Sequence, residues 1–427
     1  MVNEVPPSDQ DIAKLRRSLS NVGGPSRYRG DPALKDQLEA AFTPPDGFPE
    51  RALTHAFHPW PGRMHPHTAR SLIAMAPEGA IADPFMGAGT VPLEALLAGR
   101  QAVGNDLNPI GHEVAWVRTR RFSKAATQAL VARAKAVWKV AEGRIEAPRR
   151  VSPELARWFD TQALHEVLAL SEVLREGRPE WPGSPADPLS RTLRAVLSSL
   201  LVKASRQVSD SITKVDRVAH DPTPVGRVGH WFKKRAQELA AELDEVTVAV
   251  SREVPEPLLI KGDAREVPAD LPALAAVVSS PPYPGVYDYF AHHLLRCLVL
   301  GIETGSVADR EIGSRRQSER IGLEVARDRY VDDLARVLRG WSRGLVPGGF
   351  VALVIGDGQV GKKVVRVMPL LTKAAAAVGL QIRGTVSQAR PVFSGARDEG
   401  PADPRPAPKE EHLVWLEPTL VPEARDE

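Results

Sequence analysis

The sequence predicts an α/β protein built on one mostly parallel sheet with helices on both faces. Seven runs have the length and apolar content of strands: 79–83, 101–106, 257–262, 276–279, 346–356, 380–391 and 411–416. Helical patterns separate most of them, and the last two runs are typical of an antiparallel pair. Because strands that alternate with helices pair in parallel through right-handed crossovers, we expect a seven-stranded, mostly parallel sheet.

Composition limits the class of protein. With 427 residues, 43% of them hydrophobic, the chain can form one large or two medium domains. One cysteine, Cys297, excludes a disulfide framework and a cysteine-rich metal site, and it fits a reducing compartment. No apolar run reaches membrane-spanning length and the N-terminus has no hydrophobic signal core, so we expect a cytoplasmic protein without a membrane. The net charge of +3 permits nucleic-acid binding without requiring it.

One strand ends abruptly in Ser-Pro-Pro-Tyr at residues 280–283. Two successive prolines lack backbone donors and have a fixed φ, so the sheet cannot continue through them. A rigid loop therefore carries Ser280 and Tyr283 at the carboxyl end of a strand. In an open parallel sheet, that edge is where ligands bind.

A glycine-rich turn follows the first predicted strand. Gly87 and Gly89 allow the backbone to approach a ligand closely, and the helical pattern resumes directly after them. The next strand ends in Asp106, about twenty residues further on, where a carboxylate accepts hydrogen bonds from ribose hydroxyls. The alternative for Asp106 is a turn-forming aspartate before Asn-Pro, and we favour the ribose role because of the preceding turn.

Two of these segments resemble motifs of the S-adenosylmethionine-dependent DNA amino-methyltransferases. Residues 280–283 resemble the catalytic motif of that family, in the spelling more typical of the members that methylate cytosine N4 than of those that methylate adenine N6. Residues 83–90 resemble its Asp-Pro-Phe-x-Gly-x-Gly-Thr signature. The resemblance implies a Rossmann-like class I methyltransferase fold, S-adenosylmethionine as cofactor and DNA as partner.

The resemblance also implies the site residues. The catalytic residues would be Ser280, Pro281, Pro282 and Tyr283, with Ser280 and the Pro281 carbonyl accepting from the target amine and Tyr283 stacking on the base. The residues at the cofactor would be Arg63, Asp83, Pro84, Phe85, Gly87, Gly89, Thr90, Asp106 and Asp263. In this interpretation Arg63 lies near the methionine carboxylate and Asp263 near the adenine amine. No metal is expected, because the four histidines between residues 55 and 67 lack the spacing of a ligand set.

The resemblance covers residues 55–110 and 257–417, and it divides the chain into three parts. We expect an N-terminal arm at 1–50, a methyltransferase domain made of 51–119 and 254–420, and a helical insertion at 120–253 that could read the target DNA. The insertion carries the basic residues Lys203, Arg206, Lys214, Arg217, Arg227, Lys233, Lys234 and Arg235. Such a run suits phosphate contacts, and it is also what a solvated helix face looks like.

Several alternatives stay open. The same scaffold could methylate adenine N6 or RNA, or it could be a binding module without activity, and a role in restriction-modification or another defence system is one setting for the enzyme. Tyr287, Tyr289 and His292 could line the substrate pocket or simply pack against the sheet. Residues 303–328 look like a loop that closes over the substrate. The oligomeric state cannot be read from the sequence.

Overall fold

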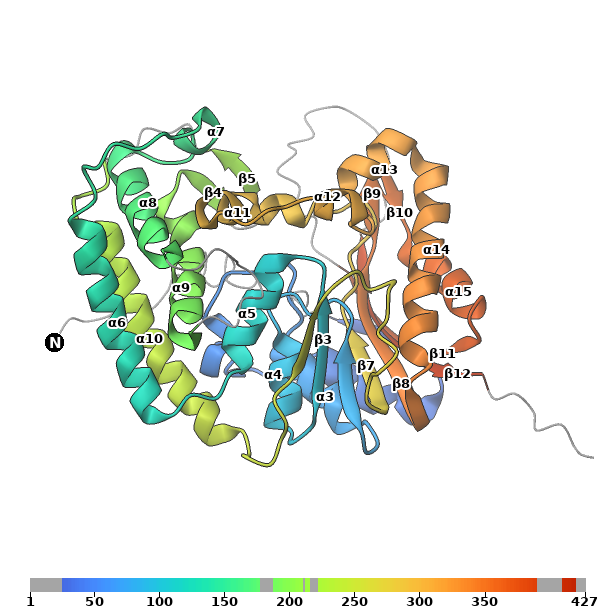
Figure 1. The fold of residues 1–427 in the computed structure, drawn as a ribbon. Coiled ribbons are helices and arrows are strands. Elements are labelled where there is room, and N and C mark those ends of the chain that lie inside the picture. Colours follow the sequence, from blue (N-terminus) through green and yellow to red (C-terminus); the bar gives the residue numbers. More distant parts are fainter. Residues whose placement is uncertain (1–24, 177–186, 210–211, 216–221, 390–408, 420–427) are drawn as a thin grey trace, which may run out of the picture.

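The computed structural model describes residues 25–176, 187–209, 212–215, 222–389 and 409–419. Their main feature is a mixed α/β arrangement around one large sheet (Figure 1). The strands of that sheet, in spatial order, are β1 (Ser26–Gly30), β11 (Leu380–Ala389), β12 (Glu410–Pro418), β8 (Leu345–Gly356), β7 (Leu274–Ser279), β2 (Ala80–Asp83), β3 (Ala102–Asp106) and β6 (Leu258–Lys261).

The half of the sheet from β8 to β6 is parallel throughout. β8 pairs with β7, β7 with β2, β2 with β3 and β3 with β6, each in parallel. Beyond β8 the pairs with β12, β11 and β1 are antiparallel. The carboxyl ends of β7, β2, β3 and β6 therefore lie next to one another along one edge, and Ser280, Asp83, Asp106 and Asp263 all occur at those ends.

The described sheet has eight strands, so the expected count of seven was one too low. The additional strand is β1, whose sequence Ser-Arg-Tyr-Arg-Gly has no apolar alternation and is mostly exposed. Within the described part of the chain it is an edge strand paired with β11 alone, so its position depends on a distant partner and leaves no local signal. Residues 26–42, expected within an N-terminal arm, thus belong to the sheet and to the helix packed on it.

Helices cover both faces because side chains alternate along the buried strands. Ile81 and Val278 pack on one face with α2 (Lys35–Phe42), α3 (Pro66–Ala74) and α4 (Thr90–Leu97). Ala82 and Val277, their neighbours in sequence, pack on the other face with α14 (Leu323–Ser342) and α15 (Val367–Ala376). This two-sided burial explains why the strands are almost entirely apolar.

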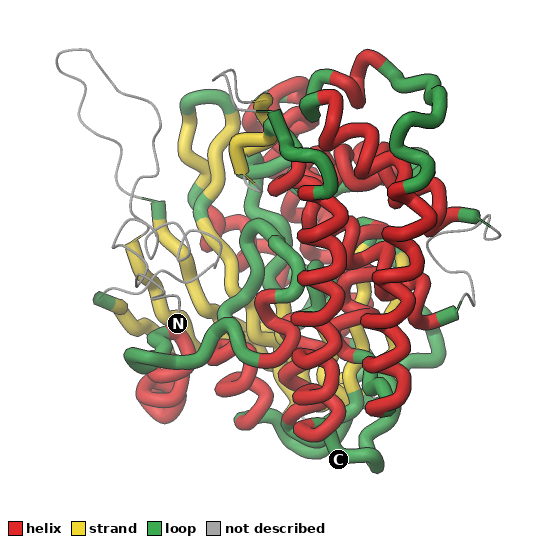
Figure 2. Tube along the Cα trace, turned by 90° about the vertical axis from the view of Figure 1, so that its left-hand side faces the viewer, coloured by secondary structure: helices red, strands yellow, loops and turns green. Residues whose placement is uncertain are grey.

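A group of helices stands beside the sheet between β3 and β6 in sequence. Its members are α5 (Pro109–Thr119), α6 (Lys124–Glu142), α7 (Pro153–Ala156), α8 (Thr161–Arg175), α9 (Pro188–Ala204) and α10 (Arg227–Ala249), with a small pair of strands β4 (Gln207–Ser209) and β5 (Ile212–Val215). Figure 2 views the molecule from this side and shows long helices in front of the strands. A Cβ on Gly229 would lie 2.2 Å from the Trp138 ring, so the close crossing of α6 and α10 depends on that glycine.

The segment after Ser-Pro-Pro-Tyr begins with turns and irregular backbone. Residues 284–289 form turns, and only then come a short 3-10 helix, η3 (Phe290–His293), and α11 (Leu294–Leu300). Two further short helices follow before α14, and a hairpin follows β8. The remaining elements are η1 (Pro32–Leu34), η2 (Leu53–Ala56), α12 (Val307–Arg310), α13 (Arg315–Ile321), β9 (Gly358–Val360) and β10 (Lys363–Val365).

Candidate active site

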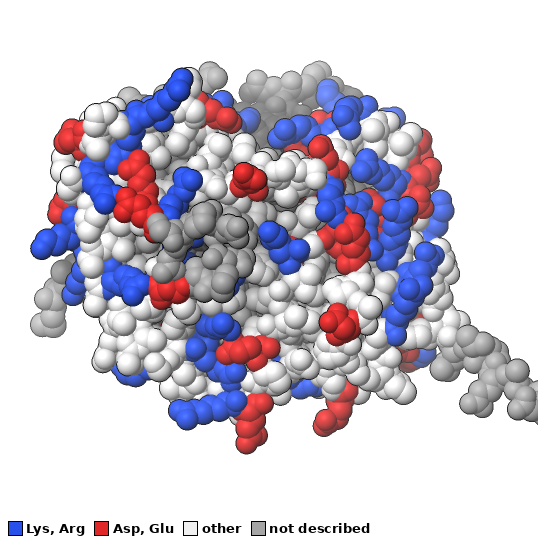
Figure 3. Space-filling model, viewed as in Figure 1, with Lys and Arg blue, Asp and Glu red and all other residues white. Residues whose placement is uncertain are grey.

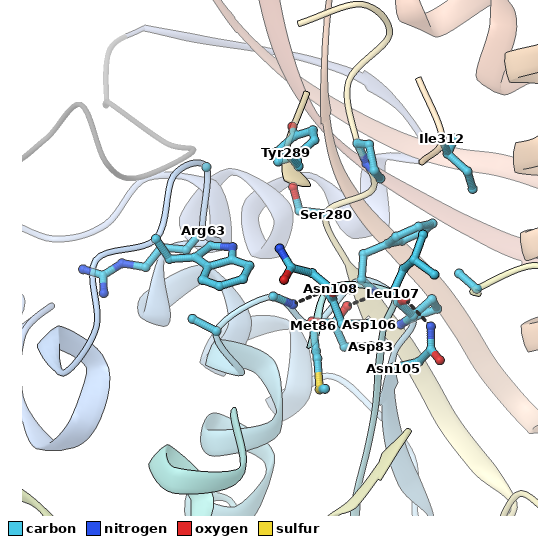
Figure 4. A pocket seen from close by; sticks show the side chains of 18 of the residues that line it. Arg63, Asp83, Met86, Asn105, Asp106, Leu107, Asn108, Ser280, Tyr289 and Ile312 are labelled. Carbon is cyan, nitrogen blue, oxygen red and sulfur yellow. Dashed lines mark hydrogen bonds between the residues drawn. The ribbon is translucent and has the colours of Figure 1, made fainter. Parts of the chain in front are cut away.

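A pocket opens at the carboxyl edge of the parallel strands. It encloses about 1000 Å³ between protein atoms, open solvent at its mouth included. Of the residues predicted for the cofactor and for catalysis, ten line it: Arg63, Asp83, Pro84, Phe85, Gly87, Thr90, Asp106, Asp263, Ser280 and Pro282. The two motifs, almost 200 residues apart in the chain, thus meet in one cavity (Figure 4).

A direct hydrogen bond joins the first motif to Ser279, the residue before the second motif. The Ser279 hydroxyl donates to Asp83 Oδ1 at 2.5 Å, and the same oxygen accepts from the Phe85 N–H at 3.0 Å. Burial raises the pKa of Asp83 to about 7 against these two hydrogen bonds, which lower it. The strand ends of β2 and β7 are therefore connected through a carboxyl group close to its protonation point at neutral pH.

Asp106 shapes the glycine turn on which the pocket depends. Its Oδ2 accepts from the Gly87 N–H at 2.8 Å and its Oδ1 from the Asn108 N–H at 2.7 Å. Burial raises the pKa of this carboxyl to about 6. An ionised carboxylate has about four acceptor sites, so two remain for a ligand.

The turn itself is backed by aromatic and charged side chains. A Cβ on Gly87 would lie 2.7 Å from Trp60 Nε1, and Trp60 is stacked on His293 with ring centroids 4.1 Å apart. Behind the turn, the fully buried Arg118 donates to the Ala88 carbonyl at 2.6 Å. Arg118 lies thirty residues from the turn, in a helix with no local motif, so the sequence offered no signal for it.

Arg118 also explains one of the four histidines. Its guanidinium lies 3.0 Å from His55 Nδ1, and His55 Nε2 lies 2.8 Å from the Glu94 carboxylate. Burial lowers the pKa of His55 to about 4, so the neutral ring accepts from Arg118 and donates to Glu94. Among the described residues no group of three or more His, Cys, Asp or Glu side chains is arranged to hold a metal ion.

Polar atoms without partners gather at this pocket. Eight buried side-chain nitrogen or oxygen atoms of the described residues have no hydrogen-bond partner, and four of them belong to residues that line it: Arg63 Nε, Thr90 Oγ1, Asn105 Oδ1 and Asn108 Nδ2. Buried polar groups are normally paired, so Thr90 Oγ1, Asn105 Oδ1 and Asn108 Nδ2 suit a polar ligand, whereas the Arg63 guanidinium is directed away from the cavity.

Three predicted cofactor residues are placed differently from their expected roles. Arg63 lines the pocket, but its guanidinium donates to the His55 carbonyl and points away from the cavity in Figure 4. Gly89 does not line the pocket, and its φ of +81° starts α4 against Ala115, where a Cβ would lie 2.8 Å away.

Asp263 is the third. It lines the pocket, but its carboxylate already accepts from Arg265 at 2.8 and 2.6 Å and from Arg310 at 3.2 Å. These hydrogen bonds outweigh desolvation and hold the pKa of Asp263 below its ordinary value. An adenine amine at this carboxylate would compete with the half-exposed Arg310.

The Ser-Pro-Pro-Tyr loop presents Ser280 and Pro282 to the pocket. Pro281 instead borders a small gap with Leu334 on the α14 side of the sheet. The Tyr330 hydroxyl donates to the Pro282 carbonyl at 2.7 Å, which fixes the loop from α14.

Tyr283 does not line the pocket. Tyr283 is only 5% exposed and packs in the apolar core, and its hydroxyl donates to Glu411 at 2.6 Å. A Cβ on Gly356 would lie 2.6 Å from its ring. The structure therefore does not place Tyr283 where it would stack on a base, because core packing holds the phenol below the loop.

The sequence interpretation missed the residues that close the pocket opposite the strands. Val307, Arg310, Glu311 and Ile312 line it from the segment expected to be a loop over the substrate. Glu311 accepts from the Phe290 N–H at 3.0 Å, and burial raises the pKa of its carboxyl to about 8. A lone Glu in a charged segment carries no pattern that would single it out.

The basic residues of the helical region are not equivalent. Those that are exposed are Lys203, Arg206, Lys214, Arg227 and Lys234, whereas Lys233 and Arg235 are half-buried and Arg217 lies outside the described residues. Arg235 is paired with Glu242 at 2.9 Å and packs over the Phe57 ring, so it acts as an internal contact. On the face shown in Figure 3, Lys and Arg are interspersed with Asp and Glu.

Comparisons with known proteins add one relative. Over 74 residues the chain is 35% identical to the type II methyltransferase M.MvaI of Kocuria varians, a match that covers 16% of this chain and 16% of that protein. The chain therefore matches about one sixth of the length of this relative. No protein-family model matches the chain. None of the helices in the described residues is long and apolar enough to cross a membrane.

Proposed function

We propose that this chain is a DNA methyltransferase that uses S-adenosylmethionine to methylate the exocyclic N4 amine of cytosine. The observation that carries the proposal is the shared pocket: the Gly87 turn and Asp106 line it together with Ser280. The short similarity to a type II methyltransferase supports the same reaction class. The choice of cytosine N4 over adenine N6 rests on serine, rather than Asp or Asn, at position 280.

The residues fit such a cofactor. The remaining acceptor sites of Asp106 suit ribose hydroxyls, and the unpartnered Thr90 Oγ1 and Asn108 Nδ2 can hydrogen-bond its polar groups. S-adenosylmethionine supplies an electrophilic methyl group when it is bound.

The catalytic loop would orient the nucleophile. The lone pair of the cytosine amine is delocalised into the ring, so the amine must be held with that lone pair directed at the methyl group. Ser280 Oγ is the acceptor we propose for one of its N–H bonds, whereas Pro281, whose carbonyl was the expected second acceptor, does not line the pocket. Positioning of this kind supplies much of the barrier reduction in a direct transfer. A base in a duplex has to flip out to reach the cavity.

The domain division is part of the proposal. Residues 51–119 and 254–420 would form the catalytic domain, with β1 added at its edge, and the helices between 120 and 253 would contact DNA through their exposed basic residues. The expected setting is the cytoplasm. We leave Arg235 out of the DNA contacts because its ion pair is internal.

The test is methylation of DNA by the full chain. Unmethylated genomic DNA is incubated with the protein and labelled S-adenosylmethionine, digested to nucleosides and analysed by mass spectrometry. We expect labelled N4-methylcytosine; N6-methyladenine would correct the base, and label in RNA alone would correct the substrate.

A single substitution then tests the assigned roles. Ser280→Ala should lower turnover at least about 100-fold, because it removes an acceptor that orients the amine, while calorimetry should find cofactor affinity within about twofold of wild type. Joint loss of turnover and cofactor binding would contradict the separation of the two roles.

A further inference from the structure

The proposed reaction needs a surface that holds the target base beside Ser280, and Tyr283 does not provide it. Its ring is in the core and its hydroxyl is bonded to Glu411. Rotating the Tyr283 ring into the pocket would break that hydrogen bond and remove the contact between the ring and Gly356. A different aromatic side chain of the pocket wall is therefore required, an argument that rests on the proposed function.

Tyr289 is the aromatic residue of the pocket wall whose position best suits stacking on a base held at Ser280. It lines the pocket together with Ser280, and in the view of Figure 4 these two residues lie toward one end of the cavity and Met86 and Asp106 toward the other. Its ring extends toward the loop on the far wall, where a Cβ on Gly62 would lie 4.0 Å from Tyr289 Cε1. The ring therefore stands over the catalytic end of the cavity, away from the ribose end.

Tyr289 is not a member of the apolar core. Its neighbour Phe290 is 7% exposed and packs in the cluster of the helical region, whereas Tyr289 is half-buried and belongs to none of the apolar clusters formed by the described residues. The apolar packing of this segment is therefore carried by Phe290, in the cluster of the helical region.

The surroundings hold Tyr289 in place. The Glu311 carboxylate accepts from the backbone N–H groups of both Tyr289 and Phe290, the latter at 3.0 Å. The Tyr287 ring meets the Tyr289 ring edge-on, with centroids 5.3 Å apart and planes inclined by 65°. A ring fixed by its backbone and by a neighbouring ring loses little freedom when a base stacks on it.

We propose that Tyr289 is the aromatic platform for the target base, and that Glu311 and Tyr287 position it. The base enters between this ring and the Ser280 loop, so its exocyclic amine reaches Ser280 Oγ. Tyr283 supports the loop from the core and does not touch the base. Stacking on a tyrosine tolerates any base, so selection among bases falls to Ser280 and the residues around it.

Photo-crosslinking tests the contact directly. Random-sequence single-stranded DNA containing 5-iododeoxycytidine is irradiated with the full chain in the presence of S-adenosylhomocysteine, and fragmentation mass spectrometry assigns the attached residue. We expect attachment at Tyr289 and its loss in Tyr289→Leu. Attachment at Tyr283 would overturn the proposal.

Kinetics separate a platform from a structural residue. Tyr289→Leu should raise the KM for DNA or lower kcat by a combined factor of roughly 5 to 150, the range of base–aromatic stacking, with cofactor affinity unchanged. Tyr289→Phe keeps the ring and should restore turnover to within about threefold of wild type. Loss of cofactor affinity in Tyr289→Leu, or full activity in it, would refute the platform.

The outcome is distinguishable from failure of the proposed function. If the wild-type chain binds S-adenosylmethionine but labels no DNA, the proposed reaction is wrong. If it labels DNA and Tyr289→Leu labels it equally well, only the platform is wrong.

Discussion

Replacing Gly87 by alanine tests the geometry of the cofactor turn most directly. Gly87 has φ +49°, and a Cβ there would lie 2.7 Å from Trp60 Nε1 and 3.1 Å from Trp60 Cε2. The indole cannot easily retreat, since it is stacked on His293 and a Cβ on Gly111 would already lie 3.1 Å from its other edge. Either Trp60 moves into the pocket or the Gly87 N–H leaves Asp106.

The magnitude has two parts. An alanine with left-handed φ costs about 1–2 kcal/mol of folding stability. The overpacking against Trp60 adds about 1–3 kcal/mol, and because Gly87 and Trp60 both line the pocket, we expect this part as lost affinity. At 1.4 kcal/mol per factor of ten, the dissociation constant for S-adenosylmethionine should rise about 5- to 150-fold.

Gly99→Ala is the matched control. Gly99 has φ +74°, so it carries the same backbone penalty, but a Cβ there meets nothing within 4 Å. Titration calorimetry with S-adenosylmethionine and urea unfolding on both variants separate affinity from stability. If Gly87→Ala binds the cofactor within twofold of Gly99→Ala, the turn does not contact the ligand and the assigned site is wrong.

Three further outcomes are expected. Because burial raises the pKa of Asp83 to about 7 from its ordinary 3.8, its contribution to stability is complete below pH 4 and is lost as the pH rises through 7. The free energy of unfolding of Asp83→Asn should therefore increase relative to that of wild type between pH 4 and 8, by at most about 4 kcal/mol at 1.36 kcal/mol per pKa unit. An equal pH dependence of the two proteins in urea titrations would contradict this. In the helical region, Lys234→Ala should reduce the slope of log affinity for duplex DNA against log salt by about 1 without loss of stability. Arg235→Ala should instead lower the unfolding temperature, because the ion pair between Arg235 and Glu242 is internal. If fluorescence anisotropy finds the same salt slope for Lys234→Ala and wild type, Lys234 does not contact DNA.

The sequence was informative wherever a local pattern of residues is compatible with few backbone structures. Buried strands flanked by helices dictate a parallel sheet, and the order of those strands places their carboxyl ends at one edge. The glycine turn before α4, the acid at the end of β3 and the proline-stiffened loop after β7 were all readable, since each needs a residue type that few other contexts require. The pocket joins these three segments, as expected.

Other features were decided by partners far along the chain. β1 is a strand only because β11 offers an edge, and its own residues have no strand pattern. Arg118 reaches the glycine turn across the packing of α5, and Glu311 reaches Tyr289 from a charged segment with no periodicity. Such contacts depend on how elements pack, which local sequence does not encode.

Ser280 and Tyr283 show the limit most clearly. The sequence placed both on the same rigid loop, and that is correct for the backbone. It could not determine which side of the loop each side chain takes, because the answer depends on the space left by Gly356 and on the Glu411 carboxylate of a strand more than a hundred residues later. The chain by itself thus determined which loops meet, and tertiary packing determined which side chains face the cavity.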